Sequence, residues 1–151
     1  MEAEVMAGLG RLGAAASVAM AAVGSALGAG VAGMAAVGAW KKCFAQSRAA
    51  PFILVTFVGA PLSQTIYGMI LMNNILRAAA ESPAQFWGMI GTGLFGGIAM
   101  GVSAWYQGKV GAGAADAMAE TGKGFGNYLM ALGIVETVAL FVMVFIGAAV
   151  R

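Results

Sequence analysis

Long apolar runs alternate with short polar segments along this chain of 151 residues. The runs 12–40, 49–76 and 82–108 contain no formal charge, and 124–150 contains only Glu136. A helix needs about 20 apolar residues to cross a hydrocarbon core of roughly 30 Å. All four runs are longer than that. The pattern therefore predicts an all-α membrane protein with four transmembrane helices, some of which tilt or project beyond the bilayer.

We expect one membrane domain, 1–151, with helices over 8–45, 49–79, 83–120 and 124–150. The composition agrees, because 61% of the residues are hydrophobic and only 9% are charged, against about a quarter charged in soluble domains. No basic run with interleaved aromatic residues is present, so nucleic acid is not expected as a partner. With no His and a single Cys, the usual zinc patterns and an intrachain disulfide are excluded.

The distribution of basic residues predicts the orientation. The side that carries the first and third connections has five of them, and the other side has three. The five are Lys41, Lys42, Arg48, Lys109 and Lys123, and the three are Arg11, Arg77 and Arg151. By the positive-inside rule, these two connections lie in the cytoplasm and both termini lie on the extracytoplasmic side.

A faint internal repeat divides the chain into two helical hairpins. Four residues of the first helix, Ser25, Ala26, Gly30 and Gly33, recur 78 residues later as Ser103, Ala104, Gly108 and Gly111. Gln64-Thr65 recurs 72 residues later as Glu136-Thr137. An even number of spans per repeat makes the halves parallel copies around an axis along the membrane normal. Gln64 then takes the place in the first hairpin that Glu136 takes in the second.

Small residues recur every four positions in the first and third helices, as in Gly24-x-x-x-Gly28 and Gly93-x-x-x-Gly97-x-x-x-Gly101. This spacing lets helix backbones approach closely in lipid. Ordinary packing within one four-helix bundle explains it. So does a homo-oligomeric ring, with the first and third helices inside and the bulkier second and fourth facing lipid. One small-residue helix per repeat favours the ring.

Glu136 lies near the middle of the last apolar run. A carboxylate at the centre of a membrane helix costs roughly 2.5–3.5 kcal/mol on insertion scales, and ionisable residues in such places mark ion or proton pathways by default. Gln107 and Glu136 are about equally far from the connection near 121–122, and the repeat places Gln64 at matching depth. Ser63-Gln64 follows Pro61, which frees a backbone carbonyl in mid-helix.

These polar groups suit a cation. One carboxylate with several neutral oxygens fits Na⁺, whereas a proton needs only the carboxylate. A single glutamine in a membrane helix more often forms an interhelical hydrogen bond than binds an ion. Tyr67 can pack against its neighbours without a role in ion binding. Lys109 either snorkels to the cytoplasmic edge or marks where the third helix leaves the membrane.

Three motifs, Pro61-Leu62-Ser63-Gln64-x-x-Tyr67-Gly68, Gln107-Gly108-Lys109-Val110 and Val135-Glu136-Thr137, occur together in the chain. They resemble the rotor-ring proteolipid, also called the K or c subunit, of V-type and archaeal-type rotary ATPases, in particular its four-helix sodium-binding form. The resemblance covers nearly the whole chain, including its length, four spans, duplicated hairpin and Gly-rich helices.

The resemblance implies a role for each site residue. Glu136 would bind the ion, with further ligands from Ser63, Gln64, Gln107 and the backbone carbonyl of Ala60. Tyr67 would donate a hydrogen bond to the glutamate. Two positions depart from the family pattern: Ser63 replaces a common threonine but keeps the hydroxyl, and Leu62 stands where a small glycine can sit.

The resemblance also implies partners. They are further copies in a ring, lipid, a stator subunit with an essential arginine, and a central stalk on the cytoplasmic loops with Lys41, Lys42, Arg48 and Lys123. The setting is a prokaryotic plasma membrane. The chain has no nucleotide-binding motif, so we expect no enzyme activity of its own and no cofactor besides the carried Na⁺ or H⁺. ATP hydrolysis or synthesis would take place elsewhere in the complex.

Two other classes remain open. Stand-alone four-helix secondary transporters usually carry their carboxylate in the first helix beside aromatic residues. Here the first apolar run has no acid, and its one aromatic residue is Trp40 at the end. A purely structural membrane oligomer would need neither Glu136 nor its polar neighbours.

Overall fold

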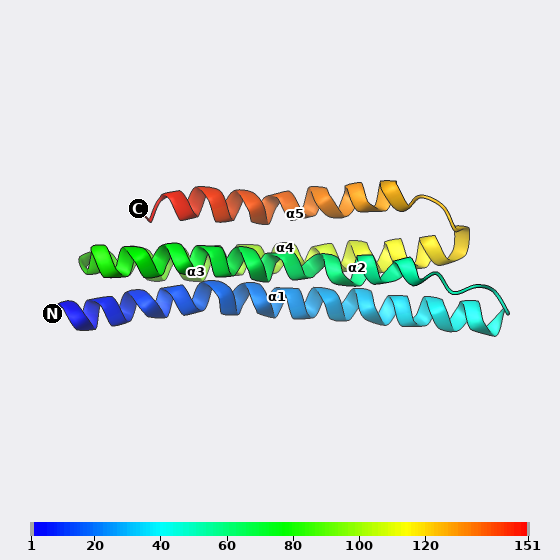
Figure 1. Ribbon diagram of the computed structural model, residues 1–151, viewed down its shortest axis with the longest axis horizontal. Helices are drawn as coiled ribbons and strands as arrows, with labels where there is room; N and C mark the ends of the chain where they lie inside the picture. The colour runs from blue at the N-terminus through cyan, green and yellow to red at the C-terminus, as the bar shows by residue number, and fades with distance from the viewer. Residues whose placement is uncertain (1, 151) are drawn as a thin grey trace.

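The computed structural model describes residues 2–150, and every regular element in this part of the chain is a helix. In chain order the elements are α1 (Ala3–Ala45), η1 (Phe52–Leu54), α2 (Val55–Gly59), η2 (Ala60–Leu62), α3 (Ser63–Glu81), η3 (Pro83–Gln85), α4 (Phe86–Thr121) and α5 (Phe125–Ala148). The elements η1 to α3 follow one another without a break and form one span, Phe52–Glu81, which we call the second span. Figure 1 shows long, nearly parallel rods with both termini at one end.

The predicted fold class is confirmed: between residues 2 and 150, four helices are long and apolar enough to cross a membrane. The chain is a multi-pass membrane protein. The bounds differ most at α1, which begins at Ala3 rather than at residue 8, with Glu4 in its first turn. An acidic side chain there stabilises the exposed N–H groups of the helix start. The second span begins at Phe52 rather than at 49 because the residue before Pro51 is disfavoured in a helix.

The helices α1 and α4 touch backbone to backbone. A Cβ atom on Gly24 would lie only 2.0 Å from the carbonyl oxygen of Gly101, and a Cβ atom on Gly93 only 1.8 Å from that of Gly13. Only glycine fits at such positions. The small residues predicted to allow close approach therefore join the two repeats within one chain.

The register of α1 against α4 reproduces the sequence repeat. The contacts are those of Gly13 with Met89 and Gly93, and of Gly28 with Ala104 and Gly108. Gly13 thus lies opposite position 91, between Met89 and Gly93, and Gly28 lies opposite position 106, between Ala104 and Gly108. Both offsets equal 78 residues, the offset of the sequence repeat. The two helices are parallel, and residues related by the repeat lie at the same height, as expected for parallel copies of a hairpin.

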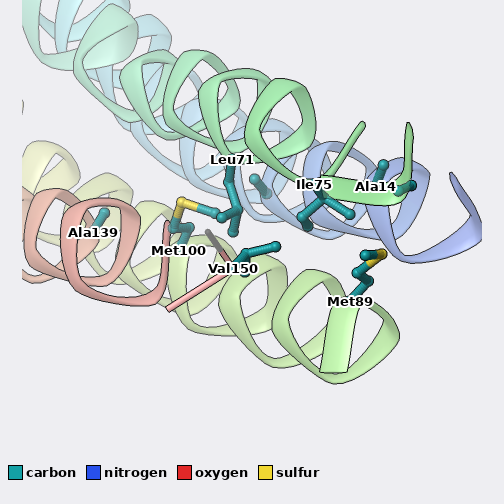
Figure 2. Close-up of a cluster of buried hydrophobic side chains, with 9 residues drawn as sticks. Ala14, Leu71, Ile75, Met89, Met100, Ala139 and Val150 are labelled. Atoms are coloured by element: carbon teal, nitrogen blue, oxygen red, sulfur yellow. The ribbon is translucent and has the colours of Figure 1, made fainter. Parts of the chain in front are cut away.

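The second span and α5 pack over this pair and enclose two apolar clusters. The cluster nearer the termini, drawn in Figure 2, is built around Leu71, Met89 and Met100. The other lies toward the opposite end and is built around Phe57 and Leu132. On the second span, Gln64 falls midway between Phe57 and Leu71, so a polar layer separates the two clusters.

Side-chain contacts also connect α1 and the loop after it to α4, at the end of the molecule opposite the termini. Lys42 of α1 forms an ion pair with Glu120 of α4, and the Arg48 guanidinium donates to the backbone oxygen of Ala119 at 3.4 Å. An exposed pair of this kind contributes little to stability. Two of the four basic residues predicted as a docking surface thus have partners within the chain.

We predict that Gly24→Ala destabilises the protein by about 1–3 kcal/mol, because the added methyl group must push α1 away from α4. Gly30→Ala on the same helix is the control, since nothing lies within 4 Å of a Cβ atom there. Thermal unfolding in detergent measures both. Equal unfolding temperatures for the two variants would contradict the close approach of the helices.

Candidate cation-binding site

Pro61 shapes the second span where the site begins. It lies in η2, a 3₁₀ turn between α2 and α3, because proline has no N–H for the usual helical bond. The carbonyl four residues earlier, that of Phe57, faces Gly111 of α4, where a Cβ atom would be 2.8 Å from its oxygen. The glycine leaves room for this carbonyl, and the span continues as α3 without a sharp break.

The Ser63 hydroxyl connects this turn to the polar layer. It lies 3.1 Å from the Ala60 backbone oxygen and 3.1 Å from Gln64 Oε1, and both are acceptors for it. The Gln64 Nε2 atom in turn donates to Gln107 Oε1 of α4 at 2.8 Å. Ala60, Ser63, Gln64 and Gln107 are therefore linked across the interface of two spans.

The Glu136 carboxylate on α5 is the end of this chain of hydrogen bonds. Gln107 Nε2 donates to Glu136 Oε2 at 3.1 Å and to the Leu132 backbone oxygen at 3.2 Å. The Tyr67 hydroxyl donates to Glu136 Oε1 at 2.6 Å. All six residues selected from the sequence thus form one hydrogen-bonded network, with one donor on each carboxylate oxygen.

Burial separates the inner from the outer part of the network. Gln64 and Gln107 are fully buried, whereas Ser63, Tyr67 and Glu136 are half-buried. Hydrogen bonds shielded from water are stronger, and buried amides without partners are costly. The glutamines of the layer are therefore shielded from the surroundings of the chain, whereas its carboxylate is partly exposed.

The donor set of the site is oxygen-rich and carries one charge. Within residues 2–150, no group of three or more His, Cys, Asp or Glu side chains could hold a metal ion. A cation in the polar layer would therefore have Glu136 as its one carboxylate and amide, hydroxyl and backbone oxygens as its other ligands. Such oxygens are the ligands of hard cations.

Of two further side chains near the site, Ser103 was not assigned a role from the sequence, whereas Lys109 was expected to snorkel or to mark where the third helix leaves the membrane. Ser103 of α4 donates to the Val135 backbone oxygen at 2.9 Å, and this bond anchors α5 one residue before Glu136. Lys109 is exposed, with its Nζ atom 3.8 Å from the Trp105 ring centre. Lys109 lies within α4, which continues to Thr121, so snorkelling and an exit from the membrane at this lysine both remain predictions.

Comparison with known proteins gives one finding on the second hairpin. Residues 90–146 match the family model for the C subunit of ATP synthase. The matched segment comprises most of α4 and α5 and includes Gln107 and Glu136. No curated protein matches the chain. The second hairpin, which carries the carboxylate, is thus similar to a rotor-ring protein.

We predict that Gln107→Leu destabilises the fold by about 1–3 kcal/mol, because it leaves the buried Gln64 Nε2 group and one Glu136 oxygen without a partner. Thr137→Ala is the matched control: Thr137 is exposed and bonds only within its own helix, to the Ile134 oxygen. Its effect should stay within about 0.5 kcal/mol. Thermal unfolding in one detergent compares the two, and similar values would argue against a connected network.

Proposed function

We propose that this protein is the membrane rotor subunit of a V-type or archaeal-type rotary ATPase, and that each copy carries one Na⁺ ion on Glu136. The observation that supports this most is the hydrogen-bond network that joins four oxygen-bearing neighbours and Tyr67 to one carboxylate in the middle of an apolar span. The match of the second hairpin to the C subunit of ATP synthase supports the rotor class.

The packing of the chain supports a ring of identical copies. The helices α1 and α4 meet backbone to backbone and form a thin inner layer. On α5, large apolar side chains remain exposed, namely Met130, Ile134, Val138, Phe141 and Phe145. A neighbouring copy and the lipid would cover this surface, with α1 and α4 inside and the second span and α5 outside.

Ion transport would follow from the charge on Glu136. A bare carboxylate is costly in lipid, and a bound cation or proton removes its charge. The neutral site could then pass the lipid as the ring turns. An arginine on a stator subunit would displace the ion into an exit channel. ATP hydrolysis or synthesis would take place in other subunits, so this subunit is not an enzyme by itself.

The choice of Na⁺ over H⁺ rests on the number of neutral oxygens. A proton on Glu136 needs only the carboxylate and a hydrogen-bond partner, which Tyr67 supplies. The side-chain oxygens of Ser63, Gln64 and Gln107 and the Ala60 carbonyl are additional, and together they suit a hard monovalent cation. H⁺ is the alternative cargo.

The central stalk would bind at the end opposite the termini, which we place in the cytoplasm of a prokaryotic cell. Lys42 and Arg48 already have partners in the chain. Lys41 and Lys123 are exposed, so we assign the attraction of an acidic stalk surface chiefly to these two.

We predict that Glu136→Gln abolishes ion-coupled ATP turnover while the ring still assembles, because the amide keeps the shape of the carboxyl group without its charge. Glu120→Gln is the matched control. This glutamate is exposed at the loop end and should leave coupling intact. Coupled activity in reconstituted vesicles measures both, and continued pumping by Glu136→Gln would exclude the proposed carrier.

We predict that Na⁺ in the millimolar range protects Glu136 from labelling by a carbodiimide at fixed pH, because the reagent needs the protonated carboxyl group and a bound cation displaces that proton. The labelled fraction, followed by mass spectrometry, measures protection. K⁺ at equal ionic strength is the control. Labelling that depends on pH and not on Na⁺ would identify H⁺ as the cargo.

A further inference from the structure

Ser25 on α1 is buried at the level of the polar layer without a hydrogen bond. It is 2% exposed, and within residues 2–150 its Oγ atom is the buried side-chain polar atom that has no partner. Buried hydroxyl groups are normally bonded, and each exception calls for an explanation. Ser17, two turns earlier on α1, donates to the backbone oxygens of Ala14 and Gly68.

The register of α1 against the second span places Ser25 opposite Gln64. These helices are antiparallel, and their contacts include Gly10 with Ala79, Ala21 with Gly68, and Gly28 with Pro61. In each contact the two residue numbers add up to 89, as do those of Ser25 and Gln64. Ser25 lies between Ala21 and Gly28 on one face of α1. Gln64 lies between Pro61 and Gly68 on the facing side of the second span.

A cation in the proposed site would require the Gln64 amide to change partners. In the present structure Gln64 Nε2 donates to Gln107 Oε1, and Gln64 Oε1 accepts from Ser63. A cation attracts both amide oxygens and repels N–H groups. When Gln107 Oε1 turns to the cation, the Gln64 NH₂ group needs another acceptor. Ala21 and Gly28, the neighbours of Ser25 on this face of α1, have no polar side-chain atom.

We propose that Ser25 is a positioning residue of the cation site: its hydroxyl oxygen accepts a hydrogen bond from Gln64 Nε2 and holds the Gln64 oxygen toward the ion. This inference rests on the proposed cation-carrying function. It differs from the roles of Ser63, Gln64 and Gln107, because Ser25 acts through Gln64 and does not touch the ion. In the structure Gln64 Nε2 donates to Gln107 Oε1, and the Ser25 hydroxyl has no partner.

The test compares Ser25→Ala with Ser25→Thr, which keeps the hydroxyl group, in the assembled ring. The measurement is the Na⁺ concentration that gives half-maximal protection of Glu136 from carbodiimide labelling. Loss of one hydrogen bond to the ligand should raise this concentration roughly three- to tenfold in Ser25→Ala. Ser25→Thr should stay near the unmodified protein. The pH midpoint of labelling without Na⁺ should not move, because the donors on the carboxylate are Tyr67 and Gln107.

A second background tests whether the effect passes through Gln64. In Gln64→Ala rings, the further change Ser25→Ala should leave the Na⁺ requirement unchanged. An undiminished effect there, an equal loss in Ser25→Thr, a shifted pH midpoint, or failure of Ser25→Ala to assemble would each overturn the proposal and show a structural role. Absence of Na⁺ protection in the unmodified ring would instead refute the cation function itself, so the two failures are distinguishable.

Discussion

The backbone contact between α1 and α4 is the constraint on which the rest of the structure depends. Gly24 and Gly101 approach so closely that no side chain fits between them, and lipid gives no hydrophobic drive for helices to associate, so such close packing must hold them together. The contact fixes the relative height of the two repeats. The second span then lies over both helices, and Gln64 reaches Gln107 only because that height is fixed.

The polar layer shows how a membrane chain can carry a charge at mid-depth. The two glutamines are buried between apolar clusters on either side, so their hydrogen bonds are protected from water. Gln64 donates to Gln107, and Gln107 donates to Glu136, which itself stays half-buried. Donors from two other spans, Tyr67 and Gln107, thus stabilise the carboxylate, and its side chain stays partly exposed.

Much of this arrangement could be predicted from the sequence, because insertion into lipid excludes charge from long stretches. The charge-free runs predicted the spans. The repeat and depth counting selected Ser63, Gln64, Gln107 and Glu136, the family resemblance added Ala60 and Tyr67, and the structure joins all six in one network. The start of α1 at Ala3 could not be predicted, since that end is stabilised by Glu4 and by contact of Gly10 with Ala79 rather than by a hydrophobic run. Neither could the partners of individual atoms, such as the Ser103 bond to Val135, because they depend on helix rotation.

The replacement of a second carboxylate by Gln64 has a consequence for stoichiometry. Each copy contains two hairpins, but only the second has a carboxylate in the middle of a span, at Glu136. In the proposed ring, a full turn would therefore move one ion for every four helices rather than one for every two. With fewer ions moved per turn, more of the free energy of each ATP is available per ion. Such a rotor would move fewer ions for each ATP but could drive each ion against a steeper gradient.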